Sequence, residues 1–253
     1  MLQFGGVEVA NLPGKPLHLA IGMFDGLHLG HQSVIEAAIH SARRSGGLAG
    51  VLTFWPHPSV IFRPDAPTQL LMSPDMKRAV LARMGVDVLI EQNFSREFAA
   101  IGAGEFVPWL QRHLPSLAAV YVGENWRFGR GREGDVAALV GYARETGLSV
   151  YSLPRLNHNG APVSSSRIRE LVAAGDIAAA NAMLGYSYFA DGMVERGRQL
   201  GRTIGFPTLN IAWEPVLQPR YGVYAVVVSA EGGPAVQGVA NYGIRPTVES
   251  VSR

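Results

Sequence analysis

The ten residues Gly22-Met23-Phe24-Asp25-Gly26-Leu27-His28-Leu29-Gly30-His31 join a short apolar run to a long amphipathic segment. The apolar run, residues 17–22, has the length and composition of a buried strand. Residues 31–45 repeat apolar side chains at helical spacing, and Gly46-Gly47 ends that pattern. A strand, a glycine-containing loop and a helix in this order predict the first unit of a parallel α/β sheet.

The alternation continues along the chain. Further strands are expected at 48–54, 87–91, 117–122 and 148–153, and further helices at 74–84, 105–113, 135–145, 165–174 and 176–184. This order predicts a parallel sheet with helices on both faces and a ligand crevice at the carboxyl ends of the strands. After Gly185 the pattern changes. Residues 188–194, 222–229 and 235–241 are β-rich, so a small antiparallel barrel or sandwich is expected from about Tyr186 onward.

The composition narrows the class of protein. Of 253 residues, 47% are hydrophobic and 17% are charged, which suits a packed globular protein. Lys plus Arg number 22 and Asp plus Glu number 20, and a net charge of +2 does not indicate a nucleic-acid partner. Cysteine is absent, which excludes disulfides, thiol catalysis and cysteine-bound metals. No signal peptide is visible, and no apolar run approaches the roughly 18 residues of a membrane span. We therefore expect a cytoplasmic protein without a membrane partner.

The loop at 22–31 offers a seat for phosphate at the start of the expected helix. Gly26 and Gly30 let the backbone approach a ligand closely, and the N–H groups and dipole of a helix start attract an anion. His28 and His31 are three residues apart, so both imidazoles can donate hydrogen bonds to phosphate oxygens as charge builds in a transition state. The alternative is a glycine-rich loop with two incidental histidines, which the His-x-Gly-His spacing after a first strand disfavours. The candidate phosphate-binding residues in this loop are Gly22, Phe24, Asp25 and Gly30.

Two further segments have side chains that suit a nucleotide or a flavin. Residues 53–58, Thr-Phe-Trp-Pro-His-Pro, indicate either a rigid loop at the ligand edge of the sheet or a plain proline turn. In the segment that begins at Asn125, Trp126 and Phe128 flank Arg127. Flat faces beside a cation can stack an adenine or flavin ring. The alternative for this second segment is an aromatic core cluster.

A run of serines precedes the helix expected at 165–174. Ser164, Ser165 and Ser166 supply hydroxyl groups next to free helix N–H groups, and Arg169 follows within one turn. Together these groups predict a second anion site. The alternative is simple capping of the helix.

The β-rich part carries a different set of candidates. Gly197, Gly201 and Gly205 permit a loop whose N–H groups wrap phosphates. Thr208 and Asn210 are two residues apart, so an extended segment points both side chains the same way, and their oxygens can share a Mg²⁺ ion. The alternative is a glycine-rich β-turn region.

Several of these segments, in this order, resemble the bacterial bifunctional riboflavin kinase/FAD synthetase family. Residues 24–31 are similar to its F-D-G-x-H-x-G-H motif and residues 53–58 to its T-F-x-P-H-P motif. Residues 123–129 resemble G-x-D-F-R-F-G, with Asn125 for Asp and Trp126 for Phe. Residues 164–169 resemble S-S-T-x-I-R, with Ser166 for Thr. Residues 207–210 match the P-T-x-N motif of the kinase part.

The resemblance implies a Rossmann-like nucleotidyltransferase domain at 1–185 and a partial riboflavin kinase β-barrel at 186–253. The first would transfer an adenylyl group from ATP to FMN, giving FAD and pyrophosphate, and the second would make FMN from riboflavin and ATP. His28 and His31 would contact the α-phosphate, and Ser164, Ser165 and Arg169 would hold the leaving pyrophosphate. Mg²⁺ would bridge the ATP phosphates, and in the kinase part Thr208 and Asn210 would hold Mg·ATP.

The sequence departs from the family at its end. Family members continue past the position of Arg253, where they supply a glutamate that acts as a base, and Glu249 lies too early to match it. Kinase activity is therefore expected to be impaired. Two rival functions are another nucleotidyltransferase that uses CTP or a different acceptor, and a non-catalytic flavin- or nucleotide-binding protein. The resemblance leaves the oligomeric state open.

Overall fold

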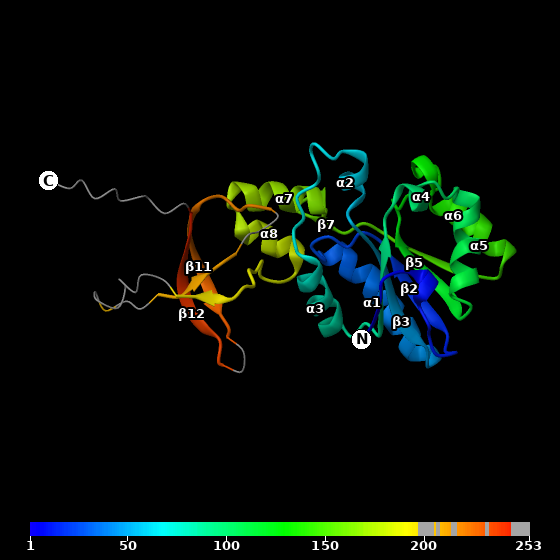
Figure 1. Cartoon of the computed structure of the whole chain (residues 1–253), viewed down its shortest axis with the longest axis horizontal. Helices are drawn as coiled ribbons and strands as arrows, with labels where there is room; N and C mark the ends of the chain where they lie inside the picture. Colours follow the sequence, from blue (N-terminus) through cyan, green and yellow to red (C-terminus); the bar gives the residue numbers. More distant parts are fainter. Residues whose placement is uncertain (197–204, 206–207, 214–216, 231–232, 244–253) are drawn as a thin grey trace.

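The computed structural model describes residues 1–196, 205, 208–213, 217–230 and 233–243 (Figure 1). Its centre is a sheet of six strands in which every pairing is parallel. In chain order the strands are β1 (Leu2–Phe4), β2 (Leu17–Ile21), β3 (Leu48–Trp55), β4 (Val88–Asn93), β5 (Leu117–Gly123) and β6 (Ser149–Leu153). Their order across the sheet is β1-β4-β3-β2-β5-β6. Strands β3 and β4 therefore lie on one side of β2, and β5 and β6 lie on the other side, so the strand order reverses between β2 and β5. This confirms the predicted α/β fold.

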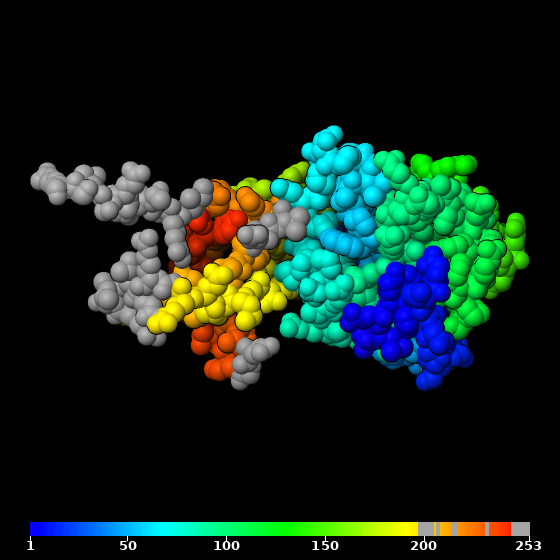
Figure 2. All heavy atoms as spheres, in the orientation of Figure 1, coloured from blue at the N-terminus to red at the C-terminus, as the bar shows by residue number. Residues whose placement is uncertain are grey.

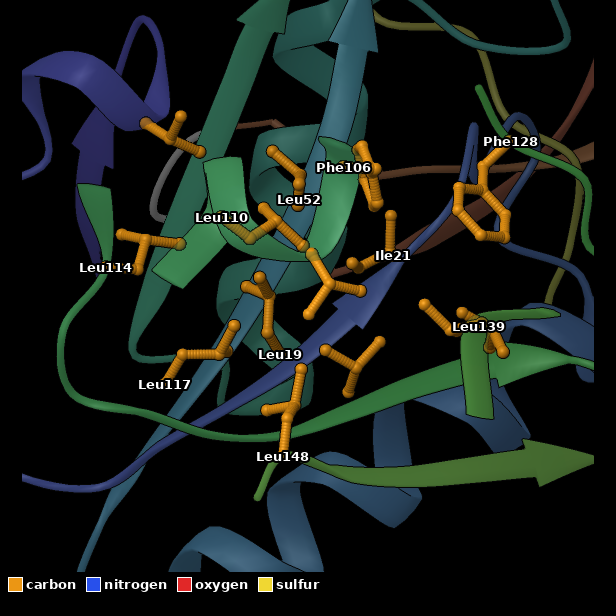
Figure 3. Close-up of a cluster of buried hydrophobic side chains, with 14 of the residues drawn as sticks. Leu19, Ile21, Leu52, Phe106, Leu110, Leu114, Leu117, Phe128, Leu139 and Leu148 are labelled. Atoms are coloured by element: carbon orange, nitrogen blue, oxygen red, sulfur yellow. The ribbon is translucent and has the colours of Figure 1, made fainter. Parts of the chain in front are cut away.

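Helices cover both faces of the sheet, as expected from the alternation. Helices α1 (Leu29–Ser45) and α3 (Pro74–Met84) bury side chains against one face, and α5 (Ala103–His113) and α6 (Val136–Glu145) against the other. Figure 3 shows the second face, where the helix residues Leu110 and Leu139 belong to one buried cluster with the strand residues Leu19 and Ile21. Strand β2 is buried along its whole length because its side chains alternate between the two cores.

Shorter elements connect these layers. They are η1 (Val7–Val9), α2 (Pro58–Phe62), α4 (Arg96–Ala99), η2 (Arg130–Arg132) and the hairpin of β7 (Asn157–His158) with β8 (Ala161–Pro162). The chain then forms α7 (Ser165–Ala174) and α8 (Ile177–Leu184), which share a third apolar cluster that includes Ile168, Val172 and Met183. Figure 1 shows this helix pair between the large sheet and the later strands.

The later strands form two small antiparallel pairs. Strand β9 (Val194–Glu195) pairs with β10 (Asn210–Ile211), and β11 (Gly222–Val228) pairs with β12 (Val236–Tyr242). In Figure 2 the described part of this region lies at one end of the molecule, in yellow to red. The strand expected over 188–194 is wrong for most of its length, because only its last residue is in a strand. Tyr188 instead donates its N–H to Asn181 Oδ1 of α8 and packs its ring against Trp213.

Candidate active site

The candidate site lies where β2 ends and α1 begins, beside the point at which the strand order reverses. Open α/β sheets bind ligands at such a point, outside the carboxyl ends of the strands. Residues 22–28 make the connection, and Leu29–Ser45 form the helix that follows. The loop predicted from the sequence therefore lies at the predicted edge of the sheet.

The two histidines stack on each other at the start of α1. His28 is the N-cap residue, and its Nδ1 accepts a hydrogen bond from the N–H of His31 at 3.3 Å. The ring centroids are 3.6 Å apart with planes 16° from parallel. Phe24 meets His31 edge-on at 5.4 Å. Gly30 makes room for this arrangement, because a Cβ there would lie 3.3 Å from the His28 ring.

The environment keeps both histidines neutral. Burial lowers the pKa of His28 to about 4, with a smaller contribution in the same direction from the charge of Arg169. Burial also lowers the pKa of His31, and the nearby His28, Lys77 and Arg169 lower it further. Because Nδ1 of His28 is an acceptor, the proton of its neutral ring sits on Nε2, which leaves one N–H donor for a ligand. His31 Nδ1 is buried and has no hydrogen-bond partner among the described residues.

The turn before the histidines has an unusual backbone conformation. Phe24, Gly26 and Leu27 have φ angles of 48°, 79° and 40°. Positive φ is costly for residues other than glycine, by about 1–3 kcal/mol each, so surrounding contacts must hold the turn. Gly26 is required for a second reason, since a Cβ there would come within 2.5 Å of Leu71.

The carboxylate of Asp25 is the central contact that holds this turn. It is 3% exposed and accepts hydrogen bonds from the N–H of Leu71 at 3.0 and 3.2 Å. It also forms an ion pair with Arg169 on α7, with 2.6 Å between Nη2 and Oδ2. Arg169 further donates from Nε to the carbonyl of Gln69 at 2.7 Å. Asp25 thus connects three segments that are far apart in the sequence.

The serine segment begins α7 against the same turn. Ser164 caps the helix by accepting the N–H of Arg167, and Ser165 donates its hydroxyl to the Asp25 carbonyl at 2.9 Å. Ser166 is exposed in the first helical turn. The structure therefore brings Ser165 and Arg169 into contact with the loop of the histidine pair. Capping by Ser164, the alternative considered above, also occurs.

Three further residues contact this loop, of which sequence reasoning missed Lys77 and Tyr186 and named Thr53 only as part of the segment 53–58. Lys77 on α3 donates from Nζ to the Met23 carbonyl at 2.9 Å, and Tyr186 donates its hydroxyl to the Gly26 carbonyl at 2.6 Å. Thr53 also donates its hydroxyl to the Met23 carbonyl, at 3.0 Å. A signal for Lys77 was present, because it lies one helical turn before the fully buried Leu81 and so on the apolar stripe of the helix.

The segment after β5 is largely an aromatic cluster. The Trp126 and Phe128 rings stack at 4.7 Å, and both contact Phe106 of α5. Phe128 is 5% exposed, whereas Arg127 is exposed and pairs with Asp135 at 3.7 Å. This packing matches the alternative of a core cluster. Asn125 is exposed. Ring contacts to a flavin or adenine stay predictions.

Aromatic packing also reaches the loop after β3. Phe62, which is 60% exposed, meets Phe94 at 6.1 Å, and Phe94 meets Phe98 at 5.6 Å. His57 caps α2, where its Nδ1 accepts the N–H of Ser59 at 3.1 Å. Residues 53–58 thus lie at the carboxyl end of β3, close to these aromatic side chains, and their contact with a ligand stays a prediction.

The glycine loop of the later region lies partly outside the described residues. Gly197 and Gly201 fall there, while Gly205 has a φ of 82°, Thr208 is exposed and Asn210 is half-buried in β10. Across the described part of the chain, no three His, Cys, Asp or Glu side chains gather into a cation site. Over the same residues, no helix is both long and apolar enough to cross a membrane.

Comparison with known proteins covers both parts of the chain. Residues 13–167 match the FAD synthetase family and residues 184–253 match the riboflavin kinase family. The Escherichia coli K12 bifunctional riboflavin kinase/FMN adenylyltransferase is 36% identical over 96% of this chain and 78% of its own length. The Bacillus subtilis protein of the same name is 34% identical over 90% of this chain and 72% of its own length.

A solved structure agrees with these matches in fold. A crystal structure named as a macrolide-efflux protein from Streptococcus pneumoniae has a TM-score of 0.85 and 27% identity, over 96% of this chain and 78% of that one. The family match covers more than half of the residues, and one relative is 36% identical, so the two comparisons together identify the family. The chain belongs to the bifunctional riboflavin kinase/FMN adenylyltransferase family.

Proposed function

We propose that the first domain, residues 1–185, transfers the adenylyl group of ATP to FMN, giving FAD and pyrophosphate. The observation that carries this proposal is the stacked, neutral pair of His28 and His31 at the start of α1. In the reaction a phosphate oxygen of FMN attacks the α-phosphorus of ATP while the bond to pyrophosphate breaks. Both groups are already anions, so no proton has to move and catalysis consists of positioning and charge stabilisation.

Each group has a role in that step. His28 donates from Nε2 to an α-phosphate oxygen, and His31 supports it from the stacked position. The free N–H groups at the start of α7, with the hydroxyls of Ser164 and Ser166, receive the leaving pyrophosphate. Arg169 supplies positive charge to the same anion while it holds Asp25 in place.

Mg²⁺ is proposed to enter as its complex with ATP. Phosphate oxygens are the hard ligands that Mg²⁺ prefers, and the described residues offer no carboxylate cluster that competes for it. When bound, the ion neutralises charge on the phosphates. Thr208 and Asn210 are proposed to play the corresponding role for Mg·ATP in the second domain, residues 186–253.

The flavin ring is proposed to bind against the aromatic edge. Phe62 is exposed and Trp126 is half-buried, and each contacts another aromatic ring of the first part of the chain. Their rings suit a flat, apolar ligand. Family membership favours FMN as the acceptor over other nucleotidyltransferase substrates. Riboflavin phosphorylation by the second domain stays a prediction from the same family.

One set of reactions tests the proposal. The purified chain is incubated with Mg²⁺ and either FMN plus ATP, FMN plus CTP, or riboflavin plus ATP, and products are separated by chromatography. FAD should form from FMN with ATP and not from FMN with CTP. In the third tube, FMN together with any FAD made from it measures the kinase. His28→Ala and His31→Ala should each lower kcat for FAD by roughly 10²–10³-fold, as for a lost oxyanion donor. His40→Ala, on the exposed side of α1, is the control. Wild-type rates in both active-site variants would refute the assignment.

A further inference from the structure

Lys77 is a buried cation that the proposed reaction does not yet use. Its residue is 8% exposed, on the face of α3 turned towards the sheet. No carboxylate forms an ion pair with it among the described residues, and its partners are two neutral oxygens. A charged side chain is rarely buried without a paired charge, because it gives up its hydration. The burial of Lys77 therefore costs free energy that its contacts have to offset.

The hydrogen bonds of Lys77 converge on one peptide group. Nζ donates to the Met23 carbonyl at 2.9 Å and to Thr53 Oγ1 at 3.3 Å. The Thr53 hydroxyl donates in turn to the same carbonyl at 3.0 Å. This carbonyl belongs to the peptide that enters Phe24, the first residue with positive φ in the turn. The triangle of Lys77, Thr53 and Met23 therefore fixes the point from which the turn departs.

Lys77 also adds a charge beside the histidine pair. The titratable groups whose charges act on His31 are His28 at the N-cap of α1, Lys77 on α3 and Arg169 on α7. Arg169 is also paired with the carboxylate of Asp25. Burial is the main cause of the lowered pKa of His31, and the charge of Lys77 acts in the same direction. A proton on His31 would add a positive charge beside those of Lys77 and Arg169, so both charges favour the neutral ring.

We propose that Lys77 is a positioning residue for adenylyl transfer: its ammonium group fixes the peptide that precedes the turn and sets a positive charge beside the histidine pair. The inference rests on the proposed function, in which the histidines contact the α-phosphate. Lys77 acts through Met23 and His31 and does not touch the reacting atoms.

Two substitutions separate the two effects. Lys77→Gln keeps an N–H donor for the Met23 carbonyl but removes the charge, and Lys77→Met removes both. We expect Lys77→Met to lower kcat for FAD by about 10²-fold with a smaller change in KM for ATP, because misplaced catalytic groups cost rate more than binding. Lys77→Gln should recover most of kcat at alkaline pH, while the acid limb of its kcat/KM profile moves to higher pH. Arg78→Met is the control, because Arg78 pairs with Asp75 and Glu91 outside this site.

A measurement without substrate tests the charge directly. Proton NMR titration of the His31 ring in the full chain, assigned with His31→Asn, should give a higher pKa in Lys77→Gln than in wild type. An unchanged His31 titration together with wild-type kcat in Lys77→Gln and Lys77→Met would overturn the inference. If Lys77→Met does not fold, Lys77→Gln decides by the same criteria. If the wild-type chain makes no FAD, the proposed function fails, and the shift of the His31 titration still decides whether Lys77 acts on this ring.

Discussion

Neutral, buried His28 makes the stability of the folded chain depend on pH, in a direction that follows from its lowered pKa. The pKa of His28 is about 4 in the folded chain, against 6.5 for an exposed histidine. Between these values the unfolded chain binds a proton that the folded chain does not, so stability falls as the pH decreases from 6.5 towards 4. Above 6.5 this group has no effect. Over the interval from pH 8 to pH 5, His28 alone accounts for a loss of about 2 kcal/mol.

His28→Asn isolates this contribution. Asparagine is a good N-cap and can still accept the N–H of His31, but it does not titrate in this range. Urea unfolding followed by circular dichroism at the two pH values should show that wild type loses about 2 kcal/mol more than His28→Asn. His40→Asn, an exposed histidine on the same helix, should behave as wild type. If His28→Asn loses as much stability as wild type, burial of a neutral His28 is not the cause and the description of the site is wrong.

Three further outcomes follow from the packing. Arg169→Ala should raise KM for ATP in the FAD assay, and Arg169→Lys should recover only part of the loss, since one ammonium cannot reproduce the fork that reaches Asp25 and the Gln69 carbonyl. Leu110→Ala, in the core of Figure 3, should lower the free energy of unfolding by about 3 kcal/mol in urea titrations. Gly129→Ala should lower the melting temperature more than Gly131→Ala. Both have positive φ, but only at Gly129 would a Cβ lie 2.7 Å from the backbone of Ala103.

Elements with clear local signals could be predicted from the sequence. The helix expected at 74–84 is α3 to the residue, because Ser73 caps it, Pro74 begins it and Gly85 ends it in a left-handed conformation. Strand β1 could not be found, since three mostly exposed residues carry no periodic signal and are ordered by pairing with β4. Helices and strands can be predicted from the sequence where their apolar period repeats several times.

The histidine pair could be predicted for the same reason, as both residues lie within one turn of a helix start. The contact between Asp25 and Arg169 could not, because 144 residues separate them and spacing in the sequence does not report distance in space. Lys77 was overlooked because a single lysine on an apolar stripe is usually read as a solvated side chain. The histidine pair could therefore be predicted from the sequence, whereas the residues that hold it in place could be identified only from the tertiary structure.

The contacts that hold the Gly26 turn come from residues that are synthesised much later than the turn itself. The turn is made early, but the groups that hold it come from Leu71, Arg169 and Tyr186, which lie 46, 144 and 160 residues further along the chain from their partners. A nascent chain that has emerged only as far as β6 contains both histidines and the sheet, yet lacks two of these three anchors. The turn before the histidine pair therefore gains its full set of contacts only after Arg169 and Tyr186 have been synthesised.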